Sequence, residues 1–302
     1  MTVNNLKIAA GIVTFNPNIE RLKEGIKSLI DQVETIYVFD NGSKNCRNIE
    51  ALTNGFTKIK FIQSLTNKGI AYALNRIYEK AKKDSYNWIL TLDHDSIVPC
   101  NFVEVLVKYI NKFGSIGVIC PFVFDKRRTA PLMTAHGEYE LTNFCMTSGS
   151  LVNLEIWELV GKYDEWLFID LVDDDFCANL IMHGYKILRV NSVKLDHELG
   201  NLKKTSYAKF VNKLADLSKI EFFRKLEYKR EVSPIRLYYS IRNIIYLNHK
   251  YRDVDAGVFY KRNCLKEGLA GIIRGNNKFK LIYSVLKGVK DGMEITKRFK
   301  LY

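Results

Sequence analysis

Two aspartates, Asp93 and Asp95, lie one residue apart in the segment TLDHDS, directly after the apolar run NWIL. The run is typical of a buried strand, and aspartate is depleted in strands, so we expect the strand to end here. Alternation along an extended chain turns both carboxylates to one side and His94 to the other. Two carboxylates that point at one spot repel each other unless a positive charge lies between them. The spacing therefore predicts a site for a divalent cation or a basic side chain.

A divalent cation at this position would suit group transfer from a nucleoside diphosphate, because the departing diphosphate carries a double negative charge. A metal ion neutralises such charge as it develops, and carboxylate oxygens suit Mg²⁺ or Mn²⁺. We expect Asp95 to bind the metal, and Asp93 to face the ribose or the water shell of the cation. The spacing also arises by chance, and a pair of aspartates that only caps a turn is the alternative.

A second acidic cluster, LFIDLVDDDF, holds four carboxylates within the six residues 170–175. Like charges so close together are costly unless some are used, and an attacking acceptor hydroxyl would need one of them as its base. Asp173 to Asp175 also fall at the expected start of a helix. Carboxylates there cap the helix and stabilise its dipole without any catalytic role, so the cluster alone leaves both interpretations open.

A histidine, His197, ends a later apolar segment in the sequence LDHELG. Imidazole is a suitable ligand for Mn²⁺, and His197 would complete a metal site with Asp95. A single histidine is more often a structural residue, and this segment alone does not decide between the two roles.

The acidic segments follow strands in a chain whose first half alternates apolar and amphipathic runs. The apolar runs predict strands over residues 6–15, 35–40, 58–64 and 88–93. The amphipathic runs predict helices over residues 19–33 and 69–83. Such alternation predicts a parallel sheet flanked by helices, whose ligands bind outside the carboxyl ends of the strands. Four polar residues fall at those ends, namely Thr14, Asp40, Asp93 and Asp95.

The second half of the chain is less regular. Short strands and loops are predicted over residues 121–154, followed by a helix over 173–185 and a strand over 186–197. The C-terminal third is largely helical, with amphipathic helices over 236–247 and 278–293.

The net charge of +13 is concentrated in the C-terminal third. Residues 1–200 have a balance of −2 and residues 201–302 a balance of +15, so we place a domain boundary near Gly200. The basic region must face an anionic partner, such as a membrane surface or a nucleic acid, or only keep the protein soluble. Basic amphipathic helices often lie in a membrane interface. Helices that pack on their own domain with a solvated lysine face are the equal alternative.

Length and composition set further limits. A chain of 302 residues with 47% hydrophobic content suffices for a substantial core. The N-terminus has no signal-peptide pattern, and no stretch approaches the roughly 18–20 apolar residues of a membrane span. The six cysteines are scattered without a CxxC pair, which predicts free thiols in a reducing cytosol rather than a zinc site.

In combination, these segments resemble the inverting glycosyltransferases of family 2, which have the GT-A fold, and among them the bacterial rhamnosyltransferase branch. The matching segments cover about residues 7–245 in the family's order: IVTFNP, VFDNGS, NKGIAYALN, TLDHDS, TSGSLV, LFIDLVDDDF, GYKI, LDHELG and SIRN. The resemblance does not extend to the last fifty-odd residues. It implies an α/β catalytic domain over residues 1–200, with a Rossmann-like nucleotide-binding mixed sheet flanked by helices. A basic, mainly helical C-terminal region over 201–302 would follow.

The resemblance also implies roles for individual residues. The nucleotide pocket would be lined by Thr14, Asn16 and Pro17, by Asp40 at the base, by Asn67, Gly69 and Asn75 near the phosphates, and by Asp93 at the ribose. The metal, Mn²⁺ or Mg²⁺, would be bound by Asp95 and His197. Asp173 would be the general base. The donor and acceptor sugars would be lined by Thr147, Ser148 and Gly149, with Asp170 and Asp175 as second choices for catalytic or acceptor-orienting roles.

An enzyme of this kind would move a sugar from a nucleoside diphosphate to a saccharide acceptor. The acceptor hydroxyl would lose its proton to Asp173 and attack the anomeric carbon opposite the diphosphate, inverting its configuration in one displacement. The resemblance favours rhamnose from dTDP-rhamnose, with UDP-hexose or UDP-galactofuranose as alternative donors. The rhamnosyltransferase branch usually has Gln between the two aspartates, and His94 in its place weakens the assignment of the donor.

The acceptor would belong to bacterial cell-surface polysaccharide synthesis. The basic, amphipathic C-terminal region suggests a lipid-linked saccharide at an anionic membrane surface. We therefore expect a cytoplasmic protein that associates peripherally with the inner face of the cell membrane.

Two other classes of protein compete with this interpretation. A Rossmann oxidoreductase needs a G-x-G-x-x-G turn after the first strand, and the segment TFNPNIE contains no glycine. A nucleic-acid-binding protein would explain the basic C-terminal third. The acidic residues at the strand ends, however, would repel the phosphates of a nucleic acid. We therefore expect no nucleic-acid partner.

Overall fold

The structure is a computed structural model, and the chain forms two compact units. The described residues are 6–124, 135–196, 202–204, 208–218, 228–230 and 232–298 of the 302. The first unit comprises residues 1–122, 135–195 and 257–259. The second unit comprises residues 123–134, 196–256 and 260–302.

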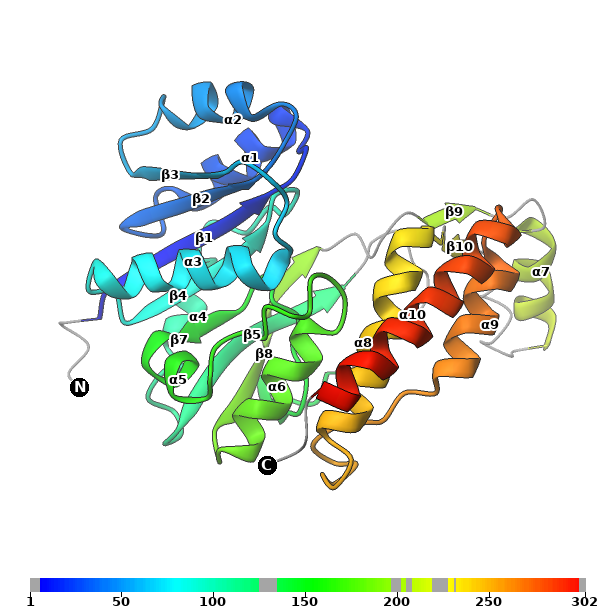
Figure 1. The fold of residues 1–302 in the computed structure, drawn as a ribbon. Coiled ribbons are helices and arrows are strands. Elements are labelled where there is room, and N and C mark those ends of the chain that lie inside the picture. Colours follow the sequence, from blue (N-terminus) through cyan, green and yellow to red (C-terminus); the bar gives the residue numbers. More distant parts are fainter. Residues whose placement is uncertain are drawn as a thin grey trace. The chain divides into compact units, whose positions relative to one another are not determined.

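An eight-stranded sheet forms the centre of the first unit (Figure 1). Its strands are β1 (Ile8–Thr14), β2 (Thr35–Asn41), β3 (Ile59–Ser64), β4 (Trp88–Asp93), β5 (Ile116–Phe124), β6 (Tyr139–Thr142), β7 (Leu151–Asn153) and β8 (Lys186–Asp196). They are arranged in the order β3-β2-β1-β4-β7-β5-β8-β6. The first four strands are parallel, as the alternation of elements predicts. Strand β7 is antiparallel to β4 and β5, and β6 is antiparallel to β8, so the whole sheet is mixed.

Six helices accompany this sheet in the described part of the first unit: α1 (Ile19–Leu29), α2 (Cys46–Thr53), α3 (Ile70–Lys83), α4 (Phe102–Val107), α5 (Leu154–Leu159) and α6 (Val172–Met182). Helices α1 and α4 share one core cluster with Ala10 and Ile12 of β1. Side chains alternate along a strand, and Gly11 faces α3, where a β-carbon would lie 2.7 Å from Ile77. Helices therefore cover both faces of β1, which explains its continuous apolar sequence.

The predicted strands and long helices match the structure within a few residues at each end. The exceptions are α2 and α4, which the sequence does not predict, and the predicted helix over 19–33, which ends at Leu29. Helices α2 and α4 have eight and six residues, too few to display a hydrophobic period clearly.

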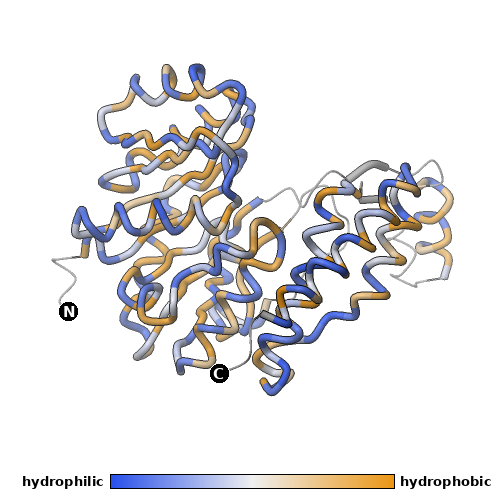
Figure 2. Tube along the Cα trace, viewed as in Figure 1, coloured by the Kyte–Doolittle hydropathy of each residue, from blue (hydrophilic) through white to orange (hydrophobic). Residues whose placement is uncertain are grey.

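The second unit is mainly helical among its described residues. Its elements are β9 (Leu202–Lys204), α7 (Ala208–Ser218), β10 (Tyr228–Arg230), α8 (Pro234–Lys250), α9 (Cys264–Arg274) and α10 (Lys278–Arg298). Ranges are predicted only for the helices that correspond to α8 and α10, and the positions of α7, α9, β9 and β10 are not predicted from the sequence. A small core of Leu237, Ile241 and Leu281 joins α8 to α10. Hydrophobic and hydrophilic residues alternate along α8, α9 and α10 (Figure 2), and no helix in the described ranges combines the length and hydropathy needed to cross a bilayer.

A close contact of α1 fixes the turn that follows β4. The backbone of Gly25 approaches the carbonyl oxygen of Ser96 so closely that a β-carbon would lie only 2.7 Å from it. The neighbouring atom belongs to the main chain and cannot rotate away. The absence of a side chain at Gly25 therefore sets how α1 and this turn pack.

We expect Gly25→Ala to destabilise the protein by about 1–3 kcal/mol, because the added methyl overpacks a backbone contact. In an unhindered helix the same change would be stabilising. Urea unfolding measures the difference. Gly114→Ala is the matched control, since a β-carbon there meets nothing within 4 Å. A Gly25→Ala variant as stable as this control would contradict the packing described above.

Candidate active site

Three polar residues lie at or next to the carboxyl ends of three adjacent strands. Thr14 ends β1 and lies opposite Asp40 of β2, while Val13 lies opposite Asp93 at the end of β4. The carboxyl ends of parallel strands are where ligands of such sheets bind. The structure thus brings Thr14, Asp40 and Asp93 together, as their positions in the sequence predict.

The carboxylate of Asp40 organises the end of β2. It is fully buried and accepts hydrogen bonds from the Thr14 hydroxyl (3.2 Å) and from the backbone N–H of Ser43 (3.2 and 3.3 Å). Burial, together with a hydrogen bond to Asp40, raises the pKa of the Cys46 thiol to about 11. The Asp40 side chain therefore fixes the loop after β2 as well as the end of β1.

The loop after β1 is fastened to the loop after β2. Asn16 has a left-handed backbone (φ 50°), its N–H donates to the Ser43 hydroxyl, and its side-chain oxygen accepts from Lys44 N–H, both at 2.8 Å. The Asn45 side chain donates to the carbonyl of Pro17 (2.9 Å). The buried Oδ1 of Asn45 has no hydrogen-bond partner among the described residues. These loops therefore offer an acceptor that the described chain does not use.

The loop before α3 lies against the acidic cluster. Asn67 and Gly69 both accept hydrogen bonds from the Asn41 side chain at 3.1 Å. Gly69 has a left-handed backbone (φ 91°), and a β-carbon there would lie 2.6 Å from the carbonyl oxygen of Phe168. The same oxygen accepts the N–H of Ile70 at 2.8 Å. Gly69 thus permits the loop after β3 to touch the segment that leads into α6.

Asn75 lies elsewhere, although the sequence analysis groups it with Asn67 and Gly69. Its side chain is buried in α3, donates to the carbonyl of Tyr163 and to Glu165, and accepts the N–H of Tyr163. Both amide hydrogens and the oxygen are therefore bonded to the segment that precedes the acidic cluster. We leave Asn75 out of the nucleotide site, because a residue one and a half turns into the helix faces that segment.

The two aspartates of TLDHDS have different surroundings. Asp93 ends β4, is partly exposed, and its N–H donates to the Ser148 hydroxyl (3.1 Å), which also bonds to Ser96. Asp95 is exposed and lies in the turn beyond the strand, where its carbonyl accepts a hydrogen bond from Arg21 (2.7 Å). Because β4 ends at Asp93, strand alternation does not determine where the Asp95 carboxylate points.

The TSGSLV segment is attached to the same strand end. The N–H of Gly149 donates to the carbonyl of Thr91 (2.7 Å), and Thr91 N–H donates to the carbonyl of Ser150 (3.0 Å). Gly149 has a left-handed backbone (φ 84°) and packs against Pro121 and Leu195. These contacts hold Thr147 and Ser148 beside the end of β4.

The start of α6 has an unusual backbone. Asp170 and Leu171 both have left-handed conformations, with φ of 66° and 63°, and each costs about 1–2 kcal/mol in a residue other than glycine. Helix α6 begins at the next residue, so Asp173 lies in its first turn. The Thr147 hydroxyl donates a hydrogen bond to Oδ1 of Asp173. The strained backbone at residues 170–171 thus places the carboxylate of Asp173 against the TSGSLV segment.

The pKa of Asp173 is raised to about 7. Burial is the main cause, and the Thr147 hydrogen bond opposes it by favouring the charged form. The charges of Asp174 and Asp93 raise the pKa further. A carboxyl group with a pKa near 7 exchanges a proton readily at neutral pH, as a general base requires. The influence of Asp93 also shows that the end of β4 and the start of α6 share one electrostatic field.

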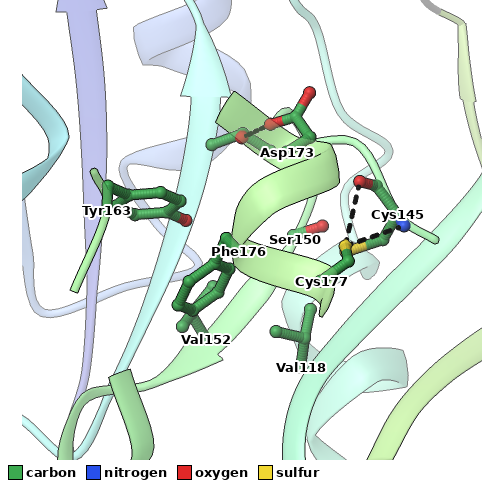
Figure 3. Close-up of a pocket in the computed structure, with 9 residues that line it drawn as sticks. Val118, Cys145, Ser150, Val152, Tyr163, Asp173, Phe176 and Cys177 are labelled. Carbon is green, nitrogen blue, oxygen red and sulfur yellow. Dashed lines mark hydrogen bonds between the residues drawn. The ribbon is translucent and has the colours of Figure 1, made fainter. Parts of the chain in front are cut away.

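Asp173 lies in a small, mainly apolar pocket (Figure 3). The pocket is lined by Val118, Cys145, Thr147, Ser150, Val152, Tyr163, Asp173, Phe176 and Cys177. In this view Asp173 is at one end and the two valines at the other. The ring of Tyr163 lies 4.4 Å from that of Phe176, and the Cys145 and Cys177 sulfurs are 3.6 Å apart. This apolar wall accounts for the raised pKa.

The buried side chains next to Asp173 are not predicted from the sequence. Tyr163 bonds through its hydroxyl to Tyr78 (3.3 Å), and Tyr78 bonds to Thr91 of β4 (2.6 Å). Cys145 and Cys177 come from different segments 32 residues apart. Such contacts leave no signal in the spacing of residues along the sequence.

The remaining predicted residues have mixed outcomes. Ser148 and Asp175 are buried in the fold, while Asp170 is partly exposed beside the pocket segment. His197 lies outside the described residues. Within the described ranges, no group of three or more His, Cys, Asp or Glu side chains could hold a metal ion. Any metal site built on Asp95 therefore needs a ligand from elsewhere.

Solved structures with a similar fold are glycosyltransferases. The mannosyltransferase PcManGT from Pyrobaculum calidifontis, in complex with GDP-Man and Mn²⁺, has a TM-score of 0.56 and 12% identity, over 98% of this chain and 76% of that chain. GalNAc-T7 with UDP, GalNAc and Mn²⁺ has a TM-score of 0.56 and 17% identity, over 99% of this chain and 59% of that chain. At these identities the likeness concerns the fold, which is the GT-A fold of glycosyltransferases.

Sequence comparison narrows this class. The model of glycosyl transferase family 2 matches residues 10–163, half of the chain, and the chain belongs to this family. The dTDP-rhamnosyl transferase RfbF of Shigella flexneri is 26% identical over 261 residues, which cover 82% of this chain and 81% of that protein. Hyaluronan synthase of Streptococcus pyogenes is 30% identical over 118 residues, 36% of this chain and only 27% of that protein. The family and fold predicted from the sequence are thus confirmed.

We expect Thr147→Val to shift the acid limb of the pH–rate profile upward by about one to two pH units. In the wild type, the Thr147 hydrogen bond stabilises the charged form of Asp173, and a hydrogen bond to a charged group contributes about 1.5–3 kcal/mol. Its loss should therefore raise the pKa of Asp173. Activity lost at pH 6–7 should therefore return at higher pH. Turnover of the sugar nucleotide between pH 5 and 9 measures this. Thr147→Ser, which keeps the hydroxyl, should retain the wild-type profile; a uniform loss with an unchanged profile would mean that Thr147 does not influence Asp173.

Proposed function

We propose that this glycosyltransferase transfers a sugar from a nucleoside diphosphate to a saccharide hydroxyl with inversion, and that Asp173 is the general base. The observation that carries the proposal is the carboxyl group of Asp173, whose pKa of about 7 comes from an apolar pocket beside the end of β4. PcManGT, which has this fold, binds GDP-Man with Mn²⁺, and GalNAc-T7 binds UDP, GalNAc and Mn²⁺. Residues 1–200 would form the catalytic domain, and residues 201–302 its basic helical region.

The nucleotide would bind over the carboxyl ends of β1, β2 and β4. We assign its pocket to the two joined loops around Asn16 and Pro17, with Thr14 and Asp40 beneath them. The unused Oδ1 of Asn45 suits a base that presents an N–H, because a buried acceptor is costly when unpaired. Asn67 and Gly69 would border the phosphates, and Asp93 the ribose.

A divalent cation, Mn²⁺ or Mg²⁺, fits the residues at the end of β4. Asp95 is exposed, its carbonyl rather than its carboxylate accepts the Arg21 bond, and carboxylate oxygens suit these ions. Asp95 would hold the ion together with His197. The bound ion would supply charge neutralisation for the diphosphate.

The chemical step would use the chain's own residues as follows. The Asp173 carboxylate takes the proton of the acceptor hydroxyl, and the Thr147 hydroxyl keeps the carboxylate oriented. The hydroxyl oxygen forms a bond to the anomeric carbon while the bond to the diphosphate oxygen breaks, and its electron pair leaves with the diphosphate. Because the attack comes from the opposite face, the anomeric configuration inverts. Ser148, Gly149 and Asp170 would line the sugars, with Asp175 supporting them from the core.

The donor we favour is dTDP-rhamnose. RfbF, which is named as a dTDP-rhamnosyl transferase, matches most of this chain and most of its own length, and this supports the assignment. A UDP-hexose or UDP-galactofuranose is the alternative donor.

The acceptor we favour is a lipid-linked saccharide of bacterial cell-surface polysaccharide synthesis. The balance of +15 in residues 201–302 would suit an anionic membrane surface. All six cysteines are free, which suits the reducing cytosol. The protein would then work at the inner face of the cell membrane.

We expect Asp173→Asn to reduce sugar transfer by at least about a hundredfold, because general-base catalysis contributes roughly 10²–10⁴ in rate. The affinity for the nucleotide should stay within about twofold, since Asp173 is assigned to the acceptor. Asp95→Ala should show the converse pattern, with weaker metal-dependent nucleotide binding. Single-turnover kinetics and nucleotide titration separate the two. A large loss of nucleotide affinity in Asp173→Asn would mean that another aspartate is the base.

We expect dTDP with Mn²⁺ or Mg²⁺ to raise the melting temperature of the protein, and dTDP with chelator to have little effect. A ligand at 100 times its dissociation constant stabilises a protein by about 2.7 kcal/mol. Parallel melts with UDP and GDP test the donor. A shift with UDP alone would keep the mechanism and replace rhamnose by a UDP sugar, whereas no shift with any nucleotide would overturn the proposed site.

A further inference from the structure

Helices α9 and α10 of the second unit form an antiparallel hairpin joined by three residues. Two neighbouring pairs define its register. A β-carbon at Gly275 would meet Leu281, and a β-carbon at Gly268 would lie 3.3 Å from Val285. From the first pair to the second, the residue number decreases on the α9 side and increases on the α10 side. The two helices therefore run in opposite directions.

Both helices turn small residues toward α8. A β-carbon at Gly271 of α9 would lie 2.6 Å from Leu237, and one at Gly288 of α10 would lie 2.8 Å from the carbonyl oxygen of Tyr238. Glycine at these positions lets the backbones approach closely. One side of the hairpin is therefore committed to packing against α8.

Away from α8, both helices carry large apolar side chains that are exposed. On α9 these recur every four residues at Leu265 (77% exposed), Leu269 (61%) and Ile273 (71%). On α10 they are Phe279 (88% exposed), Ile282, Tyr283, Leu286 and Met293. Single exposed apolar residues are ordinary, but large groups of them mark interaction sites.

The exposed apolar residues of α9 form one stripe and those of α10 form another. Helix geometry places these two apolar stripes on the same side of the hairpin. Three residues back along a helix correspond to a turn of about 60° around its axis. On α10 that step leads from Gly288, facing α8, to Val285, facing α9, and then to exposed Ile282. The same step on α9 leads from Gly271, facing α8, to Gly268, facing α10, and then to exposed Leu265. Because the helices are antiparallel, equal rotations about their own axes end on one common side.

The hairpin is also strongly basic. Residues 264–298 contain eight Lys and Arg but only three Asp and Glu, a balance of +5. Lys266, Lys280, Lys290 and Lys297 are exposed beside the apolar stripes. An apolar stripe bordered by lysines is the pattern of helices that lie in a membrane interface.

We propose that this side of the α9–α10 hairpin docks on the surface of an anionic phospholipid bilayer, with its apolar stripes in the headgroup–acyl boundary. A second copy of the chain fits less well, because two surfaces with a balance of +5 would repel each other. A nucleic acid would match the lysines but leave the leucines and Phe279 in water. Of these three, the anionic bilayer is the one that complements both the charge and the apolar side chains.

The biological role of this docking surface rests on the proposed function. The geometry of the surface does not depend on that function. A hairpin held at the membrane would keep the enzyme where a lipid-linked acceptor is found. Docking and sugar transfer use separate residues, so each can fail without the other.

Vesicle flotation of the full-length protein tests the proposal. Vesicles of phosphatidylcholine with about one third phosphatidylglycerol should carry the wild type upward, and pure phosphatidylcholine should do so far less. The variant Leu265→Ser/Leu269→Ser should bind the anionic vesicles at least about tenfold more weakly, since burying each leucine is worth about tenfold or more. The variant Lys280→Gln/Lys290→Gln should lose about fivefold per lysine on anionic vesicles alone.

A matched control separates docking from general stickiness. Leu159→Ser changes a leucine of α5 that is 62% exposed, nearly the same exposure as Leu269, and it should float like the wild type. Melting curves and the nucleotide-induced shift should be unchanged in all the variants, so a failed nucleotide site and a failed docking surface give different results. Equal recovery on neutral and anionic vesicles would overturn the proposal. So would a control that loses as much binding as the α9 variant, or a dimer that the α9 variant dissociates.

Discussion

A carboxyl group held against an apolar wall is the constraint on which the first unit depends. Burial raises the pKa of Asp173 to about 7, and the hydrogen bond from the Thr147 hydroxyl opposes this rise by favouring the charged form. A fully hydrated aspartate would be a weaker base toward a hydroxyl proton. The position of Asp173 in the first turn of α6 adds the favourable end of the helix dipole. The carboxyl group of Asp173 therefore needs both an apolar surrounding and one polar partner.

Meeting them requires the segment before α6 to be held from several sides. Asn75 bonds to Tyr163 at its beginning, and the carbonyl of Phe168 accepts the N–H of Ile70 in its middle. At its end, Asp170 and Leu171 adopt left-handed conformations that an unsupported loop would relax. The hydrogen bonds made to α3 are therefore what allows the strain to persist. In this way a helix that follows β3 determines the geometry of a helix about a hundred residues later.

The sequence predicts the part of this arrangement that periodicity controls. Asp40 and Asp93 can be placed at one edge because strands that alternate with helices are parallel and share that edge. Asn75 could not be placed this way. Its motif suggests the phosphates, but its position along α3 turns it toward the 163–165 segment. The bond between Thr147 and Asp173 joins residues 26 apart that lie on different elements, and nothing in either segment encodes it. The cysteines and Tyr163 behind the pocket come together only through tertiary packing.

The contact of Gly69 with Phe168 has a consequence for how such enzymes diversify. The loop before α3 and the acidic segment before α6 meet at one backbone carbonyl, which also begins the hydrogen bonding of α3. A chimera that exchanged only one of these segments with a relative would join two surfaces shaped for different partners. Recombination that preserves the fold must therefore move both segments together, although 98 positions of chain separate Ile70 from Phe168. Any property carried by these two segments would then be inherited as one block.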